Sequence, residues 1–123
     1  MRRNRLLILG WDAAEWELLQ QFRAEGLMPH FDRLYQGAAH GQLASLQPVL
    51  SPCLWSSIAT GKRPHQHGIL GFVEWDEATG VKPVSSRSLQ APPFWRILEQ
   101  AGLKTSLINW WPSQPVEELS GLA

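Results

Sequence analysis

The residues with the clearest chemical potential lie between Ser51 and Gly68, in the segment SPCLWSSIATGKRPHQHG. Ser51 is predicted to be the N-cap of a helix with Pro52 as its first residue, because the missing proline N–H has no helical partner there. A helix N-terminus favours anions, and phosphoryl transfer needs a nucleophilic hydroxyl beside an anion site. The alternative is that Ser51 is only a helix cap, and the segment alone favours that alternative.

A carboxylate follows the first apolar segment of the chain. Residues 5–9 predict a strand buried on both faces, as in a parallel sheet, and the apolar run is too short to cross a membrane. Asp12 then comes at the carboxyl end of this strand, where open α/β sheets place their ligands. It is therefore a candidate metal ligand. The alternative is that Asp12 caps the following helix, and Asp12 taken alone favours that alternative.

Together these segments resemble the alkaline phosphatase superfamily, and within it the type I phosphodiesterase/nucleotide pyrophosphatase branch. The resemblance covers nearly the whole chain, and it is specific because several motifs occur in one order. The matching stretches are Leu7 to Asp12, Gly26 to Leu34, and Ser51 to Ile69. In that family the first strand ends in a metal-binding Asp, which corresponds to Asp12. The nucleophile lies ten residues before the Gly of a Thr-Gly pair, which corresponds to Ser51 and Gly61.

The resemblance implies a metal-dependent phosphoester hydrolase, either a phosphatase or a phosphodiesterase, that acts on a small-molecule phosphoester through a phosphoseryl intermediate. It implies two divalent metal ions, usually zinc, with Asp12 and Ser51 as ligands. It also implies an α/β fold, a mostly parallel sheet flanked by helices in a three-layer sandwich. Because the family's remaining Asp and His ligands come from later strands, we expect residues 1–123 to be the N-terminal part of a single catalytic domain.

Two departures from the family pattern narrow this interpretation. Nucleotide pyrophosphatases carry a phosphate-binding Asn about 20 residues after the nucleophile, near Phe72 here, but no Asn lies between Ser51 and Asn109. Pro52 also lacks the amide that this position usually offers to the phosphate. Both departures argue against nucleotide diesterase activity and leave phosphoryl transfer open. The alternatives are a non-catalytic α/β binding domain and a phosphomutase of the same superfamily.

Composition indicates a globular domain with no strong preference for polyanions. Eleven basic residues balance eleven acidic ones among 123 residues, so no nucleic-acid partner is expected. One cysteine, Cys53, excludes an internal disulfide and favours a reducing, cytoplasmic location. No membrane association is expected. The sequence leaves the leaving group, the choice between monoester and diester, and the oligomeric state open.

Other residues of chemical interest lie in loops. Lys62 and Arg63 are placed to meet a phosphate, but solvated charges are the favoured interpretation. For His65 and His67, structural or exposed roles are favoured over metal or substrate binding. Tryptophans in helical patterns are expected in the core, whereas those after the last predicted strand are candidates to line a pocket. The former are Trp16, Trp55 and Trp95, and the latter are Trp110 and Trp111.

The predicted elements alternate between strands and helices, which favours a mostly parallel sheet. Strands are expected over 5–9, 42–47 and 103–109, and helices over 14–24, 27–37, 52–60 and 94–100. A loop is expected over 62–72 and a hairpin over 73–86, with its turn at Ala78-Thr79-Gly80.

Overall fold

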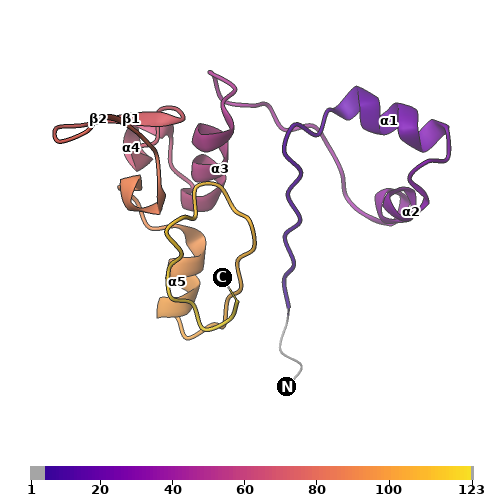
Figure 1. The fold of residues 1–123 in the computed structure, drawn as a ribbon. Helices are drawn as coiled ribbons and strands as arrows, with labels where there is room; N and C mark the ends of the chain where they lie inside the picture. Colours follow the sequence, from indigo (N-terminus) through magenta and orange to yellow (C-terminus); the bar gives the residue numbers. More distant parts are fainter. Residues whose placement is uncertain (1–4, 123) are drawn as a thin grey trace. The chain divides into compact units, whose positions relative to one another are not determined.

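The computed structural model describes residues 5–122, so residues 1–4 and 123 lie outside the described residues. The chain divides into two compact units, residues 1–44 and residues 45–123, which are described separately (Figure 1). The expectation that both belong to a single catalytic domain stays a prediction. None of the helices formed by residues 5–122 is long and apolar enough to span a membrane.

The first unit contains two helices, α1 (Trp16–Ala24) and α2 (Pro29–Gly37). Glu15 is the N-cap of α1, and its carboxylate accepts hydrogen bonds from the amides of Glu17 at 3.2 Å and Leu18 at 2.9 Å. This bond pattern satisfies the first turn of the helix. The alternative in which Asp12 caps this helix is therefore wrong.

A cation and an aromatic ring join the two helices of the first unit. The Arg23 guanidinium pairs with Asp32 at 2.5 Å and lies 3.5 Å from the centroid of the Tyr35 ring. The Trp16 ring also packs against Tyr35, with centroids 5.9 Å apart. Neither helix contains a fully buried residue, so these side contacts carry the association of α1 with α2.

The second unit contains the remaining elements. They are α3 (Ser51–Thr60), α4 (Pro64–His67), β1 (Val73–Asp76), β2 (Gly80–Pro83), the 3-10 helix η1 (Ser86–Ser88) and α5 (Phe94–Gln100). The buried apolar side chains come from α3, α5 and the segments between them, and are Cys53, Ala59, Ile69, Val84 and Trp95. The core of this unit is therefore built around the helix that begins at Ser51.

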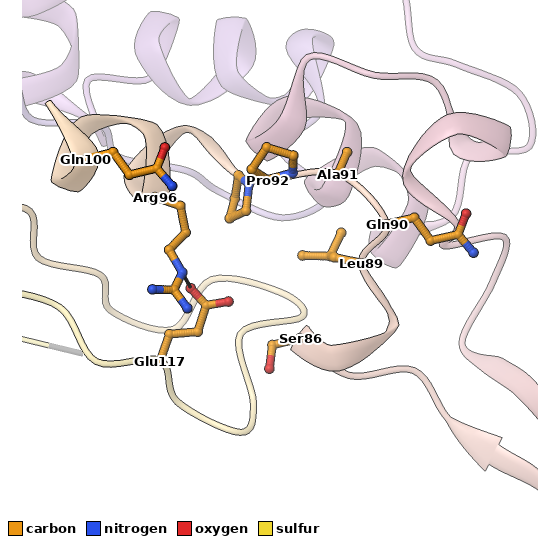
Figure 2. Close-up of a pocket in the computed structure, with 9 residues that line it drawn as sticks. Ser86, Leu89, Gln90, Ala91, Pro92, Arg96, Gln100 and Glu117 are labelled. Atoms are coloured by element: carbon orange, nitrogen blue, oxygen red, sulfur yellow. Dashed lines mark ion pairs between the residues drawn. The ribbon is translucent and has the colours of Figure 1, made fainter.

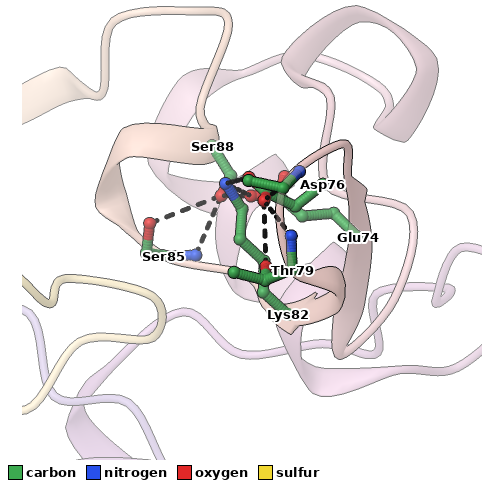
Figure 3. A network of polar contacts seen from close by, with 7 residues as sticks. Glu74, Asp76, Thr79, Lys82, Ser85 and Ser88 are labelled. Carbon is green, nitrogen blue, oxygen red and sulfur yellow. Dashed lines mark hydrogen bonds and ion pairs between the residues drawn. The ribbon is translucent and has the colours of Figure 1, made fainter.

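The hairpin of β1 and β2 is antiparallel, with Trp75 opposite Val81. A polar network on the hairpin extends to η1 (Figure 3). Lys82 pairs with Asp76 at 2.8 Å and with Glu74 at 3.6 Å. Its hydrogen bond to Asp76, together with that of Thr79, holds the pKa of the Asp76 carboxyl well below its usual range. These contacts close the hairpin turn on its polar side.

The predicted strands over 5–9, 42–47 and 103–109 are irregular segments without strand pairing. Within residues 5–122 the sheet consists of the hairpin alone, so the parallel three-layer sandwich is not present there. Leu6 is 83% exposed and Leu43 is 93% exposed, as expected for apolar segments that lack a neighbouring strand. A parallel strand needs a hydrogen-bonding partner from elsewhere in the chain, and neither unit supplies one in register.

The predicted helices agree with the structure more closely. The helix expected over 14–24 begins at Trp16, and the one over 27–37 begins at Pro29. The helix over 94–100 and the hairpin are confirmed. The loop expected over 62–72 instead contains the short helix α4 (Pro64–His67), which is followed by Gly68. Proline at the first helical position and glycine after the last one favour such a turn.

Candidate active site

The helix that carries Ser51 begins one residue earlier than predicted. Leu50 is the N-cap, with φ −124° and ψ 125°, and its carbonyl accepts a hydrogen bond from the Leu54 amide at 3.0 Å. Ser51 is therefore the first helical residue and Pro52 the second. The interpretation of Ser51 as the N-cap is wrong, because an apolar residue without a capping side chain occupies that position.

Most of the first turn of α3 is buried. Ser51 is half-buried, whereas Pro52 and Cys53 are fully buried. Burial raises the pKa of the Cys53 thiol, so this cysteine is an apolar packing residue and not a nucleophile. The proline contributes no amide, so an anion at this helix end would meet the amides of Ser51 and Cys53.

The segment after α3 returns to the helix through His67. Gly61 ends α3 with φ +65°, and its amide donates to the Ser57 carbonyl at 2.8 Å. The His67 side chain is 0% exposed, and its Nε2 lies 3.0 Å from the Ser57 hydroxyl. The structural interpretation of His67 is thus confirmed, and the exposed His65 agrees with the other half of that prediction. Lys62 and Arg63 are exposed, as expected of solvated charges.

Asp12 lies in the first unit, directly before Ala13, whose φ is +54°. The neighbouring Trp11 ring packs against Phe31 with centroids 5.7 Å apart, which anchors this turn to α2. Asp12 is exposed. Because Asp12 and Ser51 belong to different units, a metal site shared by them stays a prediction.

An aromatic cavity of about 540 Å³ lies within the second unit. Trp95, Trp110 and Trp111 contribute to its lining, which confirms the expectation that the last two line a pocket. The Trp110 ring packs edge-on against Trp55 of α3, with centroids 5.1 Å apart, and its Nε1 donates to the Trp55 carbonyl at 3.3 Å. The cavity wall therefore contacts the helix that begins at Ser51. Of the tryptophans expected in the core, Trp95 is buried, whereas Trp16 and Trp55 are half-buried.

A second, polar cavity of about 500 Å³ lies beside α5 (Figure 2). Arg96 of α5 and Glu117 of the segment after it pair across this cavity at 2.9 Å. Glu117 also accepts a hydrogen bond from Trp95 Nε1 at 3.4 Å. The ion pair thus serves to hold residues 103–122 against α5.

The model of the type I phosphodiesterase/nucleotide pyrophosphatase family matches residues 6–120 of the chain. The chain belongs to this family. The match confirms the resemblance that the segments around Asp12 and Ser51 indicate. Neither the curated proteins nor the solved structures contain a match. Membership of this family supports a phosphoester hydrolase of the phosphodiesterase or pyrophosphatase type, and the family's alkaline phosphatase-like fold.

The donors expected of a metal centre in this family are only partly supplied by the described residues. The Asp12 carboxylate is an oxygen donor of the kind that zinc takes, and the Ser51 hydroxyl is the expected nucleophile. Within residues 5–122, however, no group of three His, Cys, Asp or Glu side chains lies close enough to hold a metal ion. A metal centre that includes Asp12 and Ser51 therefore stays a prediction, and it would need further ligands besides these two.

Proposed function

We propose that this protein is a metal-dependent phosphoester hydrolase that acts through a phosphoseryl intermediate on Ser51. The observation that carries the proposal is the place of Ser51 within the family match: it is the half-buried first residue of α3, and Leu50 occupies the N-cap position. Ser51 is therefore one residue inside the helix and does not occupy its N-cap position. The substrate is a small-molecule phosphoester.

The reaction requires two displacements at phosphorus. In the first, Ser51 Oγ attacks in line, the new O–P bond forms as the serine proton is lost, and the leaving oxygen departs with the bonding electrons and takes up a proton. In the second, water attacks the phosphoserine, which releases the phosphoryl product and restores the Ser51 hydroxyl. The positive end of the α3 dipole favours the charge that gathers at this position.

The proposal assigns Asp12 and Ser51 as ligands to two divalent metal ions, with zinc as the expected metal. Such ions, when bound, lower the pKa of the attacking hydroxyl and stabilise the leaving oxygen. Glu15 occupies the N-cap position of α1 and the family match covers Asp12, so metal binding is the role that we propose for the Asp12 carboxylate. The proposal also includes the family's mostly parallel sheet, in which residues 5–9 would place Asp12 at the same sheet edge as Ser51.

The experiment that tests the proposal is capture of the phosphoserine. The full-length protein is mixed with an aryl phosphoester and zinc, quenched in acid, digested and analysed by mass spectrometry. We expect one phosphoryl group on the peptide that carries Ser51, and none when Asn replaces Asp12. Turnover without phosphorylation of this peptide would show that water attacks the substrate directly.

A further inference from the structure

We propose that His67 is the positioning residue of the Ser51 helix: its buried ring fastens the first two turns of α3 to the segment that follows the helix. The effect on catalysis rests on the proposed function of Ser51, whereas the effect on the helix does not. His67 would touch neither the substrate nor the reacting atoms in this role.

The ring reaches two successive turns of α3. Its Nε2 lies 3.0 Å from the Ser57 hydroxyl, and the Cys53 backbone also interacts with the imidazole. Cys53 and Ser57 are four residues apart and therefore lie on the same face of the helix. One side chain thus ties the turn that begins at Ser51 to the turn that follows it.

The second ring nitrogen fixes the tautomer. The Ile69 amide donates to His67 Nδ1 at 3.1 Å, so Nδ1 carries no proton in this arrangement and Nε2 carries one. His67 therefore donates to Ser57, and it has no lone pair with which to act as a base toward that hydroxyl. Burial lowers the pKa of the imidazole, which keeps the ring neutral. This excludes Ser57 as a nucleophile that is activated by His67, and it leaves His67 with a structural role. We call the contacts of the His67 ring with α3 and Ile69 the clamp.

The backbone conformation around α4 allows the His67 ring to lie against Ser57 of α3. Gly61 and Gly68 both have a positive φ, +65° and +82°, which other residues adopt only with strain. The Gln90 amide then holds the His67 carbonyl at 3.0 Å, and a Cβ on Gly68 would come within 2.8 Å of the Gln90 side chain. The glycines of the Thr60-Gly61 and His67-Gly68 pairs, which lie in the stretch that resembles the family, thus turn the chain so that the His67 ring lies against α3.

The helix needs such a clamp because its N-terminus lacks a side-chain cap. The Leu50 side chain has no atom that could accept hydrogen bonds from the first amides, so tertiary contacts have to keep the first turn in place. A residue of this turn is the proposed nucleophile, and misplacing a nucleophile by about 1 Å costs on the order of 100-fold in rate.

Two substitutions of His67 distinguish the contact of Nε2 with Ser57 from the contact of Nδ1 with the Ile69 amide. His67→Gln keeps an N–H that can reach Ser57, whereas His67→Asn can place its oxygen near the position of Nδ1 but its side chain is too short for its N–H to reach Ser57. In the full-length protein we expect the Leu54 amide to exchange about tenfold faster in His67→Asn than in the parent, which corresponds to about 1.4 kcal/mol. We expect near-parental exchange in His67→Gln. We also expect kcat of His67→Asn to fall by about 10- to 100-fold with KM little changed, and His67→Gln to retain most of it.

Several outcomes overturn the proposal. Equal Leu54 exchange in both variants and the parent excludes the clamp, and faster exchange with unchanged kcat excludes its catalytic role. Where neither His67 variant folds, Ser57→Ala removes the acceptor on the helix side and must give the same Leu54 effect. A ¹⁵N spectrum of the parent that shows Nδ1 protonated also excludes the proposal. Failure of the proposed function is read separately, as full activity in Ser51→Ala.

Discussion

A serine before a proline can be the N-cap of a helix or a residue of its first turn, and the backbone at Ser51 distinguishes between these two positions. The N-cap position belongs to Leu50, so the serine hydroxyl is one residue inside the helix. Asp12 is likewise not the N-cap of the helix that follows it, because Glu15 caps α1. In both places another residue occupies the N-cap position, and the family match covers both residues.

The first prediction at this scale concerns Ser51→Ala in the full-length protein. We expect phosphoester turnover to fall at least 1,000-fold, on the order seen when a catalytic unit loses its nucleophile. The free energy of unfolding should stay within about 1.5 kcal/mol of the parent value, because Ser51 is not at the N-cap position and the net contribution of a typical hydrogen bond is of this order. Turnover assays paired with urea denaturation measure both. Ser51→Thr is the matched control, because it keeps a hydroxyl and should retain part of the activity.

Asp12→Asn tests the metal role of the carboxylate. Removing one charged ligand should weaken zinc binding by the full-length protein about 10- to 100-fold or more, which calorimetry at fixed pH measures directly. Glu25→Gln, also in the first unit, is the control and should leave the affinity unchanged. Equal zinc affinity in Asp12→Asn and the parent would remove Asp12 from the proposed site.

At the scale of elements, helices were predictable and parallel strands were not. Proline at a helix start and glycine at its end are local signals, and they placed α2, α3 and α5 within two residues. A parallel strand depends on a partner distant in the sequence, so an apolar run such as residues 5–9 does not by itself establish one. The clamp at His67 was also beyond prediction, because Ser57 and Ile69 define the role of the ring only once α4 is formed.

Ile69 and Leu70, which follow α4, allow a prediction about the stability of the protein. Ile69 is 0% exposed, whereas its neighbour Leu70 is 66% exposed. Ile69→Ala should lower the free energy of unfolding by about 2–5 kcal/mol, because it leaves a cavity in the core of the second unit. Leu70→Ala, the matched control, should change it by no more than about 0.5 kcal/mol. Similar losses in both variants, measured by urea denaturation, would contradict the burial of this segment.

Glu99 of α5 makes the attachment of residues 103–122 dependent on pH. The hydrogen bonds of Thr105 and Ser120 lower the pKa of its carboxyl from 4.5 to about 2. The carboxylate's contribution is therefore fully present above about pH 4.5 and is lost as the pH falls through about 2. Exchange of the Ser120 amide, which donates to Glu99 at 3.3 Å, should accelerate over this range beyond its intrinsic pH dependence.

Glu99→Gln should remove this acid sensitivity, whereas Glu118→Gln in the same segment should keep it. An identical pH dependence in Glu99→Gln and the parent would show that another group holds the segment.

At the scale of the whole chain, the two proposed metal ligands belong to different units. Asp12 belongs to the first unit and Ser51 to the second, while the sheet expected to align them is absent from residues 5–122. The apolar segments that would form it, such as the one containing Leu6, are exposed. The family's fold supplies a parallel sheet for such segments, and strand pairing would bury them.

The last prediction concerns metal binding and catalysis by the 123-residue chain alone. Catalysis of phosphoryl transfer depends mainly on charges that are already in place before the reaction. No three His, Cys, Asp or Glu side chains of residues 5–122 are grouped so that they could hold a metal ion, so we expect the 123-residue chain alone to bind zinc weakly and to hydrolyse little or no aryl phosphoester. Calorimetry with zinc and a phosphoester assay with and without EDTA measure both properties. Chelator-sensitive turnover by the 123-residue chain, abolished by Ser51→Ala, would show instead that these residues assemble a sufficient metal centre by themselves.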